Sequence, residues 1–396
     1  MNIKLFSTTS TFLSLLLALF LLQPVTHAKN SKSMITIAYG LENYNFAPLF
    51  KQFTLETGIV IQIAAFKNND LKAELLQRSN INQLPDAVIV PSDFLGLSEI
   101  NYSPIPASLF SAELSTDAKE STKLGKQYLG IPIISGNHLV LYYNKKIIQE
   151  PATTWRILEQ QAQSLGKPII GWSYHEMYWF MAFVGSFDAY PLQQGKINFQ
   201  TTGLMDAMVW YKSLADKNLV NTKCNYTCAV DSFIKGSLAY TINGAWAFQQ
   251  FTDQLGDDLG VTLLPNFQGR KMAPYFSSHV IAFPNNSLTN SKSIELTALA
   301  QFFQRPTIQQ QMWQEMKVLP SNSLIKKQIM LSDNHNVQQL LLQLDNAKPM
   351  PTEHSMAVVW EALLKGMNRY LAGVFDAKKA TEYMQYITEK SLNDEQ

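Results

Sequence analysis

The sequence predicts an α/β protein built on doubly wound sheets, and three observations carry that prediction. Runs rich in β-branched and aromatic residues alternate with helical patterns from residue 34 onward. One run, 86–90 (DAVIV), is apolar after its first residue, as in strands that parallel sheets bury on both faces. The chain has 396 residues, of which 46% are hydrophobic, and this length suffices for two domains. Such alternation implies crossover connections with helices on both sheet faces.

The first five elements follow in strand–helix order. Residues 34–39 (MITIAY) predict the first strand. A helix follows and closes at Gly58, because apolar residues fall at helical spacing before it: Phe46, Leu49, Phe50 and Phe53. The remaining elements of this half are a strand with alternating isoleucines at 59–63, a helix at 71–78 and the strand at 86–90.

The same alternation returns in the second half. The predicted strands are 139–143, 169–171, 238–242 and 261–264. Thr154 is expected to open a helix, and further helices are expected at 203–218 and 245–253. Four residues of the second helix are expected to face inward: Leu204, Met208, Tyr211 and Leu214. The C-terminal third is predicted to be mainly helical, with 354–371 and 377–390 as its longest helices.

Charge and composition exclude two classes of protein. The chain has 32 Lys+Arg against 31 Asp+Glu, so it lacks the basic face with which a protein replaces the counterions of a nucleic acid. Its charged fraction of 16% is too low for disorder driven by charge. The many aromatic residues favour a large core, or pockets lined by rings.

Residues 1–28 are predicted to be a cleavable secretory signal peptide. Lys4 gives a positive start, residues 13–22 (LSLLLALFLL) are apolar apart from one serine, and small residues precede a cleavage point near Ala28. The alternative, a membrane anchor, needs about 20 apolar residues, and this run is shorter. No cysteine follows Ala28 directly, which argues against lipid attachment there. We therefore expect a soluble protein outside the cytoplasm.

The two cysteines, Cys224 and Cys228, are four residues apart in the sequence CNYTC. In an oxidising compartment such a close pair predicts a disulfide, with two free buried thiols as the alternative. A metal site would need two more ligands, and none stands nearby. Because regular helix holds the two Cβ atoms too far apart, a bridge predicts a turn over 224–228.

Motifs for catalysis and cofactor binding are missing. The sequence has no phosphate-binding loop, no dinucleotide glycine motif and no nucleophile elbow. His175 and Glu176 resemble half of a zincin motif, but Trp179 occupies the place of its second histidine. Ser323 and Lys326 match the pattern Ser-x-x-Lys without its companion motifs. We therefore expect no enzyme activity, no metal and no cofactor.

Several segments together resemble extracellular solute-binding proteins of the maltose/maltodextrin-binding type. The first runs from Gly130-Ile-Pro132 through 139–145 (LVLYYNK) to Pro151 and Thr154-Trp155. A second joins 233–236 (FIKG) to 239–246 (AYTINGAW). The resemblance extends to 259–265 (LGVTLLP), 349–351 (PMP) and 355–360, and covers nearly the whole mature chain in the order of the family.

The resemblance implies a two-lobed periplasmic binding protein fold of type II. Two doubly wound mixed sheets would be joined by a hinge of several chain crossings, with a sugar held between the lobes. The N-terminal lobe would comprise 34–136 and 276–320, and the C-terminal lobe 137–275 and 321–396. It also implies a periplasmic monomer that delivers its ligand to a membrane ABC permease.

The resemblance also implies the residues that bind the ligand. A sugar packs its C–H faces on aromatic rings and needs fixed partners for its hydroxyls. The matching positions are Glu42, Asp93, Glu176, Tyr178, Trp179, Tyr226, Trp246 and Trp360. The alternative is that a tryptophan simply packs in the core, which is its ordinary role. The tryptophans without a match are assigned to the core or the surface: Trp155, Trp172, Trp210 and Trp313.

Departures from the family pattern weaken maltose itself as the ligand. Val90 stands in place of a tryptophan, Phe94 and Leu364 in place of arginines, Glu361 in place of an aromatic residue and Asn137 in place of an acid. The departures count less against an oligosaccharide or another neutral polar ligand. Two rival functions remain: binding of a different small solute such as a polyamine, and hydrolysis on an α/β scaffold.

Overall fold

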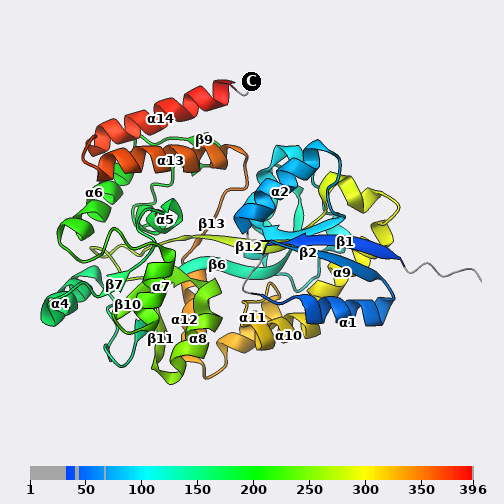
Figure 1. Cartoon of the computed structure of the whole chain (residues 1–396), viewed down its shortest axis with the longest axis horizontal. Helices are drawn as coiled ribbons and strands as arrows, with labels where there is room; N and C mark the ends of the chain where they lie inside the picture. The colour runs from blue at the N-terminus through cyan, green and yellow to red at the C-terminus, as the bar shows by residue number, and fades with distance from the viewer. Residues whose placement is uncertain (1–32, 41–43, 67, 395–396) are drawn as a thin grey trace, which may run out of the picture.

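The computed structural model describes residues 33–40, 44–66 and 68–394, in which two groups of helices flank a central set of strands (Figure 1). The predicted signal peptide, 1–28, and the predicted ligand residue Glu42 lie outside the described residues. In the described part, no helix is long and apolar enough to cross a membrane.

The first part of the chain alternates strands and helices as predicted. The elements are β1 (Met34–Tyr39), α1 (Ala47–Thr57), β2 (Val60–Ala65), α2 (Asn68–Asn80) and β3 (Ala87–Pro91). Helix α1 ends because Gly58 takes a left-handed conformation, with φ of 76°. Short elements follow: η1 (Ser92–Gly96), η2 (Ser98–Ile100), η3 (Ala107–Leu109), α3 (Thr116–Glu120), β4 (Lys123–Leu124) and β5 (Gln127–Tyr128).

The middle of the chain begins with the long strand β6 (Gly130–Asn144), which starts nine residues before the predicted 139–143. Thr154 caps α4 as predicted, because its side chain accepts a hydrogen bond from the Ile157 amide. The elements after β6 are α4 (Trp155–Leu165), β7 (Ile170–Gly171), α5 (Met177–Gly185), β8 (Leu192–Gln193), β9 (Lys196–Ile197), α6 (Thr202–Asp216), α7 (Tyr226–Ile234), β10 (Tyr240–Gly244), η4 (Ala245–Ala247), α8 (Phe248–Leu255), η5 (Gly256–Asp258) and β11 (Leu259–Thr262).

The last part is mainly helical, as the sequence predicts, and α13 and α14 are its longest helices. The strand β12 is among the elements that were not predicted. All eight of its residues are buried, but Ser277, Ser278 and His279 interrupt its apolar pattern. The elements are β12 (Tyr275–Ala282), η6 (Pro284–Thr289), α9 (Ser293–Gln304), α10 (Pro306–Met316), α11 (Ser323–Met330), α12 (His335–Asp345), β13 (Lys348–Pro349), α13 (Ser355–Leu371) and α14 (Ala377–Asp394).

Nine strands form a connected path in which two mixed sheets share β6, while β4 with β5 and β8 with β9 form two small separate pairs. The order is β2-β1-β3-β12-β6-β10-β7, with β11 on β6 and β13 on β12. Strand β1 is parallel to β2 and β3, whereas β12 is antiparallel to β3 and β6. The first part of β6 pairs with β12, and its last part pairs with β10 and β11. This sharing links the two halves of the molecule in Figure 1.

Separate apolar cores lie on the two sides of these shared strands. One side packs α1, α9 and α10 on the sheet of β1 and β3, with Phe50 and Phe303 at its centre. The other side packs α4, α5, α6 and α13 around Trp172 and Phe183. The stretch at Leu319 lies against the shared strand β6, because the Leu319 carbonyl accepts a hydrogen bond of 2.8 Å from the Ser135 amide.

Candidate functional site

Three elements bring four of the predicted ligand residues together. Tyr178 and Trp179 lie in the first turn of α5, Tyr226 is the first residue of α7, and Trp246 lies in η4 directly after β10. The ring centroids are 6.1 Å apart in each of four pairs: Tyr178–Trp179, Tyr178–Trp246, Trp179–Tyr226 and Trp179–Trp246. We call these four side chains the aromatic cluster.

Hydrogen bonds fix the rings of the aromatic cluster. Trp246 Nε1 donates to the Tyr226 hydroxyl (3.1 Å), and Trp179 Nε1 donates to the Ile242 carbonyl (2.8 Å). The Tyr178 hydroxyl reaches two carbonyls on the shared strands, those of Asn137 and Tyr275. The rings are therefore held in place by the protein.

The four side chains of the aromatic cluster differ in how much of their surface is exposed. Tyr178, Tyr226 and Trp246 are half-buried and so present part of their surface. Trp179 is buried, with 7% of its surface exposed, and it packs behind the others. Trp179 therefore supports the exposed rings more than it offers a face of its own.

Trp360 stands apart from the aromatic cluster. It lies on α13, is half-buried, and packs edge-on against Tyr275 with centroids 6.2 Å apart. Tyr275 in turn stacks on Tyr190 at 4.9 Å. Because the Tyr178 hydroxyl contacts the Tyr275 carbonyl, Tyr275 lies between Trp360 and the cluster.

The acidic residues are divided between the two sides. Asp93 lies in η1, on the side of β3, and burial raises its pKa against the opposing effects of a backbone hydrogen bond and Lys72. Its charge is close enough to Tyr178 to add to the effect of burial, which raises the pKa of that phenol. The charge of Asp93 therefore acts on one member of the aromatic cluster, Tyr178. Glu176 directly precedes α5 and is exposed.

A small cavity lies where the two sides meet. It is lined by Trp246 from the aromatic cluster and by Tyr44, Ser135, Asn137 and His279, among others, and its volume is about 10 Å³. Sequence reasoning did not find Tyr44, Ser135, His279 or Tyr275. The only available signal was a histidine and two serines inside an otherwise apolar run, 275–282 (YFSSHVIA).

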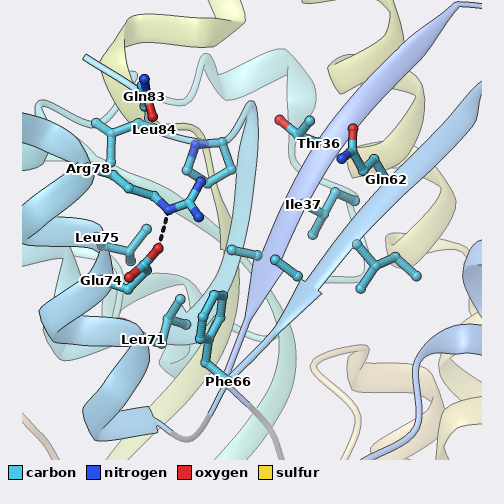
Figure 2. A pocket seen from close by; sticks show the side chains of 14 residues that line it. Thr36, Ile37, Gln62, Phe66, Leu71, Glu74, Leu75, Arg78, Gln83 and Leu84 are labelled. Carbon is cyan, nitrogen blue, oxygen red and sulfur yellow. Dashed lines mark hydrogen bonds and ion pairs between the residues drawn. The ribbon is translucent and has the colours of Figure 1, made fainter. Parts of the chain in front are cut away.

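A second and larger cavity, of about 280 Å³, is lined by none of the predicted ligand residues. Figure 2 shows it between α2 and the edge of the sheet, with Phe66, Leu71 and Leu75 on its walls. Its guanidinium and carboxylate are paired with each other, Arg78 Nε to Glu74 at 2.5 Å. The cavity is lined by both apolar and polar side chains, and its two charged groups are engaged with each other.

Cys224 and Cys228 form a disulfide, with Cα atoms 5.2 Å apart. The predicted turn over 224–228 is wrong in its second half, because α7 begins at Tyr226. Asn225 caps that helix by accepting a hydrogen bond from the Cys228 amide (2.9 Å). The bridge is compatible with the helix because Cys224 lies before the cap. Among the described residues no group of three or more His, Cys, Asp or Glu could hold a metal.

Comparisons with known proteins agree with this architecture. A curated maltooligosaccharide ABC transporter solute-binding lipoprotein of Streptococcus pneumoniae is 23% identical over 362 residues, 83% of this chain and 82% of that protein. The maltose/maltodextrin-binding domain MalE of Bdellovibrio bacteriovorus, solved with maltotriose, has a TM-score of 0.81 at 21% identity, covering 91% of this chain and 100% of that one. The maltose-maltodextrin binding protein of Alicyclobacillus acidocaldarius gives 0.79 at 18%, covering 90% and 100%.

These structural neighbours confirm the predicted fold, a two-lobed periplasmic binding protein fold with mixed sheets. The family model described as bacterial extracellular solute-binding protein matches residues 48–338, which is most of the described chain. By that match, this chain belongs to the family of bacterial extracellular solute-binding proteins.

Proposed function

We propose that this protein binds a maltodextrin-like oligosaccharide between its lobes and delivers it to the membrane permease of an ABC importer. The observation that carries the proposal is the aromatic cluster. Its half-buried rings are fixed by hydrogen bonds within the protein, and the charge of Asp93, in η1, acts on the Tyr178 phenol. Rings for the C–H faces of a pyranose and a carboxylate for its hydroxyls are what a sugar requires.

The relatives support the sugar class of the ligand. The Streptococcus pneumoniae relative is named for maltooligosaccharides, and the Bdellovibrio bacteriovorus structure was solved with maltotriose. The cavity beside Trp246, at about 10 Å³, is far smaller than a sugar ring. Binding therefore requires that the lobes separate and close again around the ligand, as in other periplasmic binding proteins.

The proposed lobes are 34–136 with 276–320, and 137–275 with 321–396. The separate cores on the two sides of β6 and β12 support this division. One of the contacts between the proposed lobes is the ion pair of Lys326 with Asp117 (3.1 Å). Burial acts to raise the pKa of Asp117, but Lys326 and hydrogen bonds outweigh it and lower that pKa.

The proposed location is the periplasm, reached through cleavage of the signal peptide at 1–28. The Streptococcus pneumoniae relative is a lipoprotein by name, whereas the cysteines of this sequence are at 224 and 228, far from the predicted cleavage point. We propose that the protein is a monomer without a lipid anchor. We also propose that it releases its ligand unchanged, because its family relatives are binding proteins.

Calorimetry on the mature protein tests the sugar class. Maltotriose is expected to bind with one-to-one stoichiometry, to raise the melting temperature and to remain intact after prolonged incubation. Small-angle scattering should give a smaller radius of gyration with maltotriose than without it. Cellobiose and spermidine serve as the comparison ligands. Binding of spermidine alone would favour the polyamine rival, and release of glucose would favour the hydrolase.

A further inference from the structure

Among the buried polar atoms on the shared strands that have no hydrogen-bond partner within the described part of the chain, two line the cavity beside Trp246. They are Nδ1 of His279, on β12, and Oγ of Ser135, on β6. His279 is 4% exposed and Ser135 is 2% exposed. Buried polar groups without partners are rare in folded proteins because each costs free energy. Their position therefore needs an explanation.

Both side chains line the same cavity beside Trp246. Strand pairing brings them together, because His279 is opposite Ile134, the residue before Ser135. Asn137, from the same wall, already donates its amide to Ser277 Oγ (2.9 Å), 140 residues away along the chain. The cavity also contains Tyr44, from the side opposite Trp246. His279 and Ser135 thus form the floor between the two sides, and we call this pair the polar floor.

The neighbouring histidine shows that the protein can place hydrogen-bond acceptors beside a buried imidazole in this region. Both ring nitrogens of His138, also on β6, lie within hydrogen-bond distance of backbone carbonyls, those of Gly136 and Leu340. His279 lacks such partners within the described residues, and burial alone lowers its pKa to about 4. Its ring is therefore neutral at pH 7 and offers one donor and one acceptor.

The lining of the cavity restricts what can meet the polar floor. None of the lining residues carries a carboxylate, an ammonium or a guanidinium. The lining consists of Tyr44, Ile134, Ser135, Gly136, Asn137, Ala245, Trp246, His279, Val318 and Leu319. An ionic group placed here would lose its hydration without gaining a partner of opposite charge. The volume of about 10 Å³ matches one water-sized group.

We propose that the polar floor binds a single hydroxyl group of the solute and so selects neutral polyhydroxy ligands over charged ones. A hydroxyl both donates and accepts, so it pairs with a serine and a neutral imidazole at once. Next to it, Trp246 provides a ring for the same sugar unit. The inference rests on the proposed function, and it adds two specificity-determining residues that the family resemblance does not supply.

The experiment measures maltotriose affinity by calorimetry in matched variants. Ser135→Ala and His279→Leu each remove one partner and are expected to weaken binding about ten-fold, because each leaves the ligand hydroxyl short of one hydrogen bond. His279→Asn keeps a polar atom near the place of Nδ1 and should stay within about three-fold of the parent. Ser278→Ala is the control, because Ser278 is buried on β12 but its Oγ accepts a hydrogen bond from Ser121 (2.8 Å).

The outcomes separate this inference from the function on which it rests. If the parent binds maltotriose and Ser135→Ala binds it equally tightly, the floor holds only a structural water, and the inference is wrong while the function stands. If the parent binds no neutral saccharide, both fail. If His279→Leu does not fold, the affinity of Ser135→Ala for maltotriose tests the inference by itself. The stability of Ser135→Ala is then compared with that of Ser278→Ala.

Discussion

The indole Nε1 of Trp246 donates a hydrogen bond of 3.1 Å to the hydroxyl of Tyr226, which joins η4 to the first residue of α7. Burial raises the pKa of Tyr226, against the effect of this bond and of Asn243. An oxygen that accepts from an indole keeps its own O–H proton for another partner. The pair can therefore offer a ring face and a hydroxyl donor to the same ligand.

Replacing Trp246 with alanine should remove the ring on which we expect the sugar to pack. The loss of one stacked ring costs about 1–3 kcal/mol, which is roughly a ten- to hundred-fold loss of maltotriose affinity. Trp360→Ala should give a loss in the same range. Trp313→Ala is the control, since Trp313 is also half-buried but lies on α10, away from the aromatic cluster. Equal affinity in all three variants would contradict the assignment of these rings to the ligand.

Asp93 should make binding sensitive to pH. Burial raises the pKa of its carboxyl, so as the pH falls the group gains a proton earlier than an ordinary aspartate does. Affinity for maltotriose should therefore fall as the pH drops through this raised pKa, and calorimetry at several pH values measures that fall. Asp93→Asn should bind about ten- to hundred-fold more weakly at pH 7 and lose the pH dependence. Glu99→Gln, at an exposed acid in η2, should match the parent.

His279 should make the folded state less stable in mild acid. Burial lowers its pKa from 6.5 to about 4 in the folded state, so between these values the unfolded chain binds the proton and the folded chain does not. Stability is therefore lost as the pH falls through this window, by about 2 kcal/mol between pH 7 and pH 5. Urea unfolding at both pH values measures the loss. His279→Asn should lose about 2 kcal/mol less than the parent, and an equal loss would contradict the prediction.

Elements that depend on local interactions were predicted from the sequence, whereas elements that depend on contacts between distant segments were not. The strand β1 and the cap at Thr154 were predicted because apolar periodicity and capping are local signals. Strand β12 was missed because its buried serines and His279 look like loop residues until β6 and β3 pair with it. The polar floor depends on that pairing between distant segments. For the same reason no local pattern could have found Ser135.

The disulfide of Cys224 and Cys228 should matter more for binding than for stability. It closes a loop of few residues, so in the loop-entropy model it constrains the unfolded chain by only about 2 kcal/mol. Its local effect is larger, because the bridge encloses Asn225 and Tyr226, the cap and first residue of α7. Holding that turn should reduce the ordering that Tyr226 requires when ligand binds.

We therefore expect Cys224→Ser with Cys228→Ser to lose maltotriose affinity out of proportion to its fall in melting temperature. Tyr226→Ala should show a similar affinity loss, because both changes act on the same ring. Tyr226→Phe keeps the ring and removes the acceptor for Trp246, so it separates packing from hydrogen bonding. Calorimetry compares the variants after mass spectrometry has established that the parent is oxidised. Free thiols in the parent, or parental affinity in the double serine variant, would show that the bridge does not preorganise Tyr226.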